Sequence, residues 1–99
     1  IASDYLPNEF ALQQNYPNPF NPSTQIRYSL PVSSNVKVVV YNMLGSKVRT
    51  LYNGNQDAGY RSVMWNATND NGDPVAAGMY IYTIEADGYF ASKKMILLK

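Results

Sequence analysis

The sequence contains no cysteine and no histidine. Without cysteine the chain forms no disulfide, offers no thiolate to a metal ion and has no thiol nucleophile. Without histidine it lacks the commonest general base and the commonest metal ligand of proteins. These two absences remove most of the usual parts of an enzyme, so we expect a protein that has no catalytic activity, no cofactor and no metal ion.

An excess of charge of one sign is also missing. Eight lysine and arginine residues stand against seven aspartate and glutamate residues, a formal net charge of +1. Strong electrostatic capture of nucleic acid or of an anionic membrane needs a larger positive excess. No apolar run approaches the roughly 20 residues that span a bilayer. We expect no nucleic-acid partner, no membrane insertion and a monomer.

The sequence instead contains short stretches of alternating apolar and polar residues, separated by turns rich in glycine, proline and asparagine. Residues 24–30 alternate cleanly, and residues 36–41 form the most β-branched run. Such stretches recur about every ten residues without helical periodicity, which is typical of an antiparallel β-sandwich. We predict an all-β domain of about seven strands.

One tryptophan, Trp65, is the largest apolar side chain available, and we expect it at the centre of the core. Residues that alternate onto the same face of the predicted strands should surround it. The expected core is Ile26, Tyr28, Leu30, Val36, Val38, Val40, Val48, Val63, Trp65, Tyr80, Tyr82 and Ile84.

Two segments carry more specific local predictions. Residues 15–22 contain three prolines, which indicate a stiff edge or crossover segment with Phe20 able to plug one end of the sandwich. A proline-rich ligand for a partner groove is the alternative. Residues 47–52 predict a short edge strand whose charges discourage pairing with another chain. A polar loop is expected over residues 53–59, and a tight turn over residues 86–88.

Several polar or aromatic clusters are candidate binding sites. Residues 69–73 offer oxygens to calcium, but the EF-hand template places Pro74 where it needs glycine and Tyr80 where it needs glutamate, so a structural loop is favoured. The sequon at Asn66 is read as a chance match.

Carboxylates fall in loops, in the linker or on outward strand positions, which argues against glycoside hydrolysis. Those carboxylates are Asp4, Glu9, Asp57, Asp70, Asp73, Glu85 and Asp87. A sugar-stacking platform is a further candidate, formed by Tyr60, Tyr80, Tyr82 and Tyr89. Alternation favours core positions for Tyr80 and Tyr82 instead.

The C-terminal stretch has apolar residues at both odd and even positions, so a strand there would carry apolar side chains on both faces. Met95 and Leu97 alternate onto one face of a strand predicted over residues 89–99, and Ile96 and Leu98 onto the other. One face belongs to the core. The other is then either a docking strip or covered by the parent protein, and a strand buried on both faces is the alternative.

Several motifs follow one another in a characteristic order. They are Gln14-Asn-Tyr-Pro-Asn-Pro-Phe-Asn-Pro22, Ile26-Arg-Tyr-Ser-Leu-Pro31, Val38-Val-Val-Tyr-Asn-Met-Leu-Gly45 with Val48, Trp65, Asp70-Asn-Gly-Asp-Pro-Val-Ala-Ala-Gly-Met-Tyr80 and Lys94-Met-Ile-Leu-Leu-Lys99. Residues 10–99 thereby resemble the type A C-terminal sorting domain of type IX secretion cargo proteins, found in Bacteroidota and related phyla. The fold of that family is immunoglobulin-like and similar to that of the flagellar hook-capping protein. The resemblance implies a single immunoglobulin-like sandwich with Greek-key connections.

The resemblance also implies a function. The domain would direct a larger secreted protein through the periplasm to the outer-membrane translocon and onward to the cell surface or the medium. A sortase-like cysteine protease would then cut in the linker, residues 1–9, which joins residues 10–99 to an upstream cargo domain. Asn42 and Asn66 stand where the family often has aspartate, which weighs further against calcium.

The expected recognition element is the last strand, through main-chain pairing along its edge and side-chain selectivity. Its residues are Lys93, Lys94, Met95, Ile96, Leu97, Leu98 and Lys99. Two other functions remain open for a domain of this class. One is a carbohydrate-binding module of a secreted glycoside hydrolase, which requires two or three exposed aromatic rings. The other is a structural immunoglobulin-like spacer.

Overall fold

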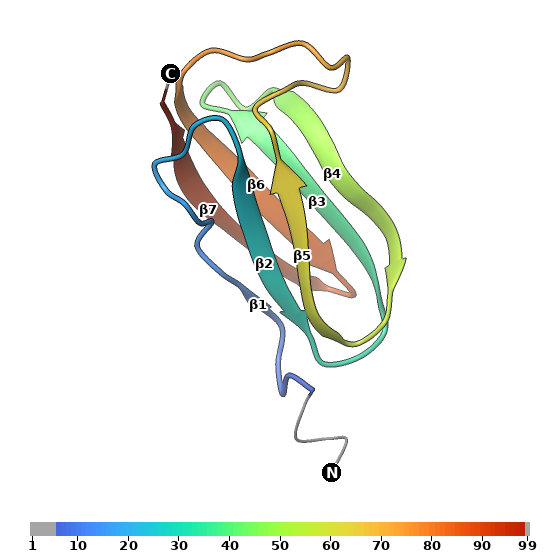
Figure 1. Ribbon diagram of the computed structural model, residues 1–99. Coiled ribbons are helices and arrows are strands. Elements are labelled where there is room, and N and C mark those ends of the chain that lie inside the picture. Colours follow the sequence, from blue (N-terminus) through green and yellow to red (C-terminus); the bar gives the residue numbers. More distant parts are fainter. Residues whose placement is uncertain (1–5, 99) are drawn as a thin grey trace.

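The computed structural model describes residues 6–98, whose strands form two antiparallel sheets packed face to face (Figure 1). The strands are β1 (Ala11–Leu12), β2 (Thr24–Leu30), β3 (Ser34–Asn42), β4 (Lys47–Gln56), β5 (Gly59–Trp65), β6 (Gly78–Ala86) and β7 (Tyr89–Leu97). Within this range there is no helix, and hence none able to cross a bilayer. The predicted all-β, immunoglobulin-like sandwich of seven strands is confirmed.

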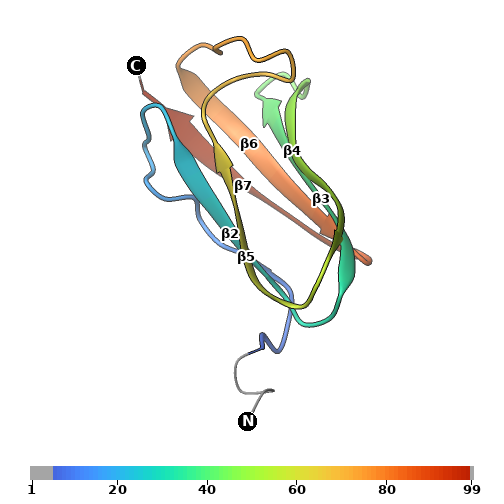
Figure 2. The same ribbon diagram turned by 45° about the vertical axis from the view of Figure 1, so that its right-hand side comes forward.

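The two sheets have the strand orders β1-β2-β5 and β4-β3-β6-β7. Hairpins join β3 to β4 and β6 to β7, whereas β2 pairs with β5 and β3 with β6 across connections that leave the sheet. Figure 2 shows β2 and β5 in one layer and β3, β6 and β7 in the other. The described chain enters at the lower end beside β1 and ends at the upper end after β7 (Figure 1).

The β6–β7 turn explains the register of the second hairpin. Asp87 and Gly88 both have positive φ, 45° and 90°. A two-residue turn of this kind matches the right-handed twist of the flanking strands, and it favours Asp-Gly because other side chains resist positive φ. Ala86 therefore lies opposite Tyr89, and the pairing continues without a shift to Gly78 opposite Leu97.

The core lies between the sheets around Trp65, which is 1% exposed. Its ring meets Tyr80 edge-on at a centroid distance of 5.2 Å and Phe20 at 5.7 Å, and its indole N–H donates to the carbonyl oxygen of Thr68 at 2.8 Å. Ten of the twelve expected core residues are buried, whereas Val48 and Val63 are half-buried and pack against the others. The core also contains Leu12, Phe20, Ala67, Ala86, Met95 and Leu97.

The proline segment, defined here as residues 14–22, crosses between the sheets at the upper end of the sandwich (Figure 1). Tyr16 forms an isolated bridge with Gln25 of β2, and Phe20 forms one with Leu97 of β7. Phe20 is 1% exposed and fills the space beside Trp65. The segment is thus a crossover that closes one end of the core, as the prolines predict.

Two boundaries differ from the sequence-based predictions. The polar loop expected over residues 53–59 is wrong, because β4 continues to Gln56 and only Asp57 and Ala58 separate it from β5. Asn53, Gly54 and Asn55 are held extended by pairing with β3, which overrides their weak local preference for a strand. The last strand, β7, ends at Leu97 and not at residue 99. The short strand β1 completes the set of seven, and the sequence pattern did not reveal it.

Candidate recognition surface on the C-terminal strand

The side chains of β7 divide between the core and the surface, as the strand period of two requires. Met95 and Leu97 are fully buried, and Lys93 is half-buried. In the folded domain Met95 and Leu97 hold the strand in place and are out of reach of a partner. Lys94, Ile96 and Leu98 point outward, with Ile96 37% and Leu98 51% exposed, while Lys99 lies outside the described residues.

The sheet register brings further apolar residues beside these two. Ile96 lies opposite Met79 of β6, which is 39% exposed, and Tyr41 of β3 lies opposite Ile81 of β6. Directly opposed residues of antiparallel strands share one face of the sheet with Cβ atoms roughly 5 Å apart. The outer face of the four-stranded sheet therefore carries a continuous apolar area at its upper end. We call it the outer patch, and it consists of Tyr41, Met79, Ile81, Ile96 and Leu98.

Two lysines border the outer patch. Lys94 lies opposite Ile81, and Lys47 lies opposite Tyr41. The nearest acidic residue of the strand β6, Glu85, lies four residues beyond Ile81 toward the lower end and opposite Lys37. The outer patch thus has lysines at its border, which favour a partner with apolar side chains and carboxylates.

The free edge of β7 is already hydrogen-bonded over its second half. The Ile96 amide donates to Oδ1 of Asn18 at 3.0 Å, and the Ile96 carbonyl accepts from the Phe20 amide at 3.0 Å. The Leu98 amide donates to the Phe20 carbonyl at 2.8 Å, and Nε2 of Gln14 donates to the Lys94 carbonyl at 2.8 Å. Because these groups are occupied, an added strand does not pair with residues 94–98 unless the proline segment moves away.

Most of the outer patch is absent from the sequence-based recognition element, which was confined to residues 93–99. Met79, Ile81 and Tyr41 come from β6 and β3 and reach Ile96 only through the register of the sheet. Each of these three residues alternates along its strand with residues whose side chains lie in the core. The signal that would have revealed them is that Met79 and Ile81 are apolar at positions where a half-buried strand has polar residues.

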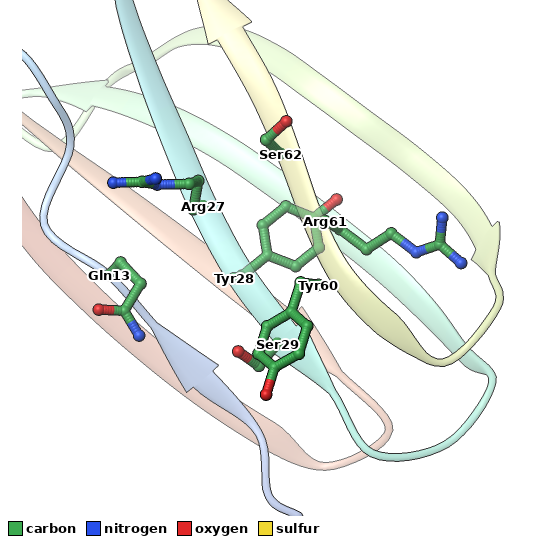
Figure 3. Close-up of a pocket in the computed structure, with 7 residues that line it drawn as sticks. All are labelled: Gln13, Arg27, Tyr28, Ser29, Tyr60, Arg61 and Ser62. Carbon is green, nitrogen blue, oxygen red and sulfur yellow. The ribbon is translucent and has the colours of Figure 1, made fainter. Parts of the chain in front are cut away.

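A second candidate surface lies on the outer face of the three-stranded sheet, where a shallow cavity of about 430 Å³ opens to solvent (Figure 3). Arg27 extends from β2 toward Gln13, Tyr60 of β5 lies beside Ser29, and Arg61 points away toward β4. The lining residues are Gln13, Arg27, Tyr28, Ser29, Tyr60, Arg61 and Ser62. Tyr28 contributes to this lining from β2, but its side chain lies in the core on the inner side of the sheet. Burial there raises its pKa to about 12, and its hydroxyl donates to Oε1 of Gln56.

The four tyrosines considered as one platform lie in different places. Tyr80 and Tyr82 are buried in the core, and Tyr89 is half-buried with its ring stacked on Phe10 at 5.2 Å. Only Tyr60 is strongly exposed, at 71%. A single platform made of these four side chains is therefore not formed.

Two side-chain oxygens of the loop over residues 69–73 accept hydrogen bonds from backbone amides, one within the loop and one toward β4. Oδ1 of Asn69 accepts from the amides of Asn71 and Asp73, each at 3.0 Å, and Oδ1 of Asp70 accepts from the amide of Thr50 at 3.0 Å. Throughout residues 6–98 no three acidic side chains gather closely enough to hold a metal ion. The Thr50–Asp70 hydrogen bond connects the β5–β6 crossover to β4.

Several solved structures are similar to this chain, including those of PorU, PorZ and FlgD. PorU from Porphyromonas gingivalis, solved as a latent dimer, is 21% identical with a TM-score of 0.72 over 93% of this chain and 10% of its own. PorZ, described as an essential surface component of the type IX secretion system of the same organism, is 19% identical with a TM-score of 0.57 over 93% and 12%. FlgD from P. aeruginosa is 32% identical with a TM-score of 0.56 over 76% and 60%.

The chain therefore spans about a tenth of PorU and PorZ and three fifths of the FlgD chain. None of the curated proteins searched matches it. The family model of the FlgD Ig-like domain matches residues 21–89, which run from the proline segment to the first residue of β7. With this match and the sandwich described above, the chain belongs to the FlgD Ig-like domain family.

Proposed function

We propose that this domain is a non-catalytic sorting domain of the type IX secretion system, which directs a larger secreted protein across the outer membrane. The order of motifs from the proline segment to residues 94–99 supports this role. The fold likeness to PorZ, a surface component of that system by its description, is in keeping with it. The proposed destination is the cell surface or the medium, reached through the periplasm.

The observation that carries the proposal is the outer patch. Exposed apolar area on a small domain is typical of an interaction surface. The patch lies at the upper end, opposite the end at which the described chain enters (Figure 1). A cargo domain joined upstream would lie toward the lower end and leave the patch accessible to the outer-membrane translocon.

The hydrogen bonds and exposed side chains of β7 support one mode of contact for such a partner. Pairing along the β7 edge at residues 94–98 competes with the proline segment, whereas the exposed side chains of Ile96 and Leu98 are accessible without any rearrangement. We therefore assign recognition to the face of the strand. Removal by a sortase-like protease would fall in residues 1–9, of which residues 1–5 lie outside the described residues.

The test is a secretion assay on a full-length cargo that carries this domain in a bacterium with a type IX system. The double variant Ile96→Ser and Leu98→Ser removes two members of the outer patch and leaves the buried Met95 and Leu97 intact. We expect the cargo to accumulate in the periplasm. Deleting residues 94–99 is a poorer test, because it also removes core side chains.

The matched control is Phe90→Ser, which removes a 63% exposed apolar residue from the lower end of the same strand. Normal secretion of this variant together with loss of secretion in the double variant would support the proposal. Unchanged secretion of the double variant would contradict recognition through the patch. Unchanged secretion after removal of the whole domain would contradict the sorting role and favour a structural spacer.

A further inference from the structure

The outer face of the three-stranded sheet presents three rows of side chains. In the lowest row Ser29 of β2 lies between Ala11 of β1 and Tyr60 of β5. In the next, Arg27 lies opposite Ser62, and its carbonyl accepts from the amide of Gln13 at 2.9 Å.

The third row is at the upper end of the same face. Gln25 of β2 lies between Tyr16 of the proline segment and Met64 of β5. Because residues paired across an antiparallel ladder point to the same side, Tyr16 and Tyr60 share this face. This face is distinct from the outer patch, which belongs to the other sheet.

Both tyrosines are unusually exposed. Tyr16 and Tyr60 are each 71% exposed, although ring surface of this size is normally buried. Ser29 and Gln25 are four residues apart, so the backbone positions of the two tyrosines are about 13 Å apart along β2 and about 10 Å apart across it, from ordinary strand dimensions. That separation exceeds what one sugar ring covers and suits a chain of linked sugars.

The surface between the rings is polar. Arg27, Ser29, Ser62 and Gln13 line the cavity of about 430 Å³ shown in Figure 3. Their hydroxyl, amide and guanidinium groups donate hydrogen bonds to oxygen acceptors. Aromatic rings that stack on the apolar faces of sugars, with polar groups that bind their hydroxyls, are the parts of an open glycan site.

The charge at the centre of this face decides which class of glycan fits. Arg61 directs its guanidinium to the carbonyl oxygens of Asp57 and Ala58, at 3.0 and 3.2 Å. Arg27 is exposed, makes no such hydrogen bond within residues 6–98 and lines the cavity, whose lining residues include no carboxylate. A planar guanidinium binds a carboxylate through two parallel hydrogen bonds.

We infer that the face formed by Tyr16, Gln13, Arg27, Ser62 and Tyr60 binds an acidic oligosaccharide, with a uronic-acid carboxylate on Arg27 and sugar rings stacked on the two tyrosines. This function is independent of the proposed sorting role. It requires neither the outer patch nor a secretion partner. A domain with both surfaces would join transport to attachment at a polysaccharide layer.

The test is native gel electrophoresis of the 99-residue chain with polygalacturonate embedded in the gel. We expect retardation that increases with the concentration of the polymer. Arg27→Gln should weaken binding about tenfold, because a hydrogen bond to a charged group is lost. Tyr60→Ala and Tyr16→Ala should each weaken it several-fold, the size of one stacking contact.

Phe90→Ala, which removes an exposed ring from the other sheet, is the matched control and should bind like the unmodified chain. Two further polymers fix the class of ligand. Equal retardation by neutral hydroxyethylcellulose would overturn the role of Arg27, and equal retardation by poly-L-glutamate would show an acidic peptide surface and overturn the glycan. Absence of retardation, or variants that behave like Phe90→Ala, would also overturn the inference.

Discussion

The hydroxyl of Tyr82 accepts a hydrogen bond from the backbone amide of Asn15 at 2.8 Å and donates one to the carbonyl of Gln13 at 2.7 Å. Tyr82 lies on β6 of one sheet, and the two backbone groups follow β1 of the other. Asn15 is itself buried, and its side chain donates to Oγ1 of Thr24 at 2.9 Å. One phenol therefore fastens the start of the proline segment to the opposite layer.

Tyr82→Phe tests that connection. The variant keeps the ring but leaves the buried Asn15 amide without a partner, and we expect the free energy of unfolding to fall by about 1–3 kcal/mol. Urea denaturation followed by Trp65 fluorescence measures the loss. Tyr60→Phe is the control, since its exposed hydroxyl should change stability by less than about 0.5 kcal/mol. Equal curves for the two variants would contradict the connection.

Phe20→Ala and Phe90→Ala form a second matched pair. Phe20 is 1% exposed and packs on Trp65, so its truncation should lower the free energy of unfolding by about 3–5 kcal/mol. Phe90 is 63% exposed and should change it by less than about 0.5 kcal/mol. A small effect at Phe20 in thermal or urea unfolding would show that the proline segment does not close the core.

Stability should depend on pH in the alkaline range. Burial raises the pKa of Tyr28 and of Tyr82 from 10.0 to about 12. Below pH 10 both phenols are neutral in the folded and unfolded chains, and their contribution is complete. Between pH 10 and 12 the unfolded chain ionises first, so stability should fall.

Urea unfolding at pH 8, 10 and 11 measures this dependence. Tyr28→Phe removes one of the two groups and should flatten the decline between pH 10 and 11. A free energy of unfolding that stays constant over that interval would contradict the burial of the phenols.

Amide hydrogen exchange should distinguish the two halves of the β7 edge. The Ile96 and Leu98 amides donate to Asn18 and Phe20, so both should exchange slowly although the strand lies at a sheet edge. Ser92 has the same parity as Ile96, so its amide also faces the free edge, and it should exchange rapidly. Asn18→Ala should release Ile96 first. Rapid exchange at Ile96 and Leu98 in the unmodified chain would show that the edge is open.

The sequence predicted the all-β class because side-chain alternation is a local property. The period of two places Ile26, Val38 and Tyr82 on the inner face of their strands, whichever strands they pair with. The Asp87-Gly88 turn is also determined by local sequence, since these two residue types match the turn geometry. The length of β4 is not determined by local sequence, because Asn53, Gly54 and Asn55 form a strand only through pairing with β3.

The sequence by itself determined that residues 95–98 offer apolar groups to both faces of a strand, because that follows from parity alone. Only the tertiary structure decided which of them remain accessible. Burial of Met95 and Leu97 and the bonds from Asn18 and Phe20 to the β7 edge depend on segments far away in the chain. The outer patch and the pair Tyr16 and Tyr60 arise in the same way, since strand register, which no local pattern specifies, sets which residues become neighbours.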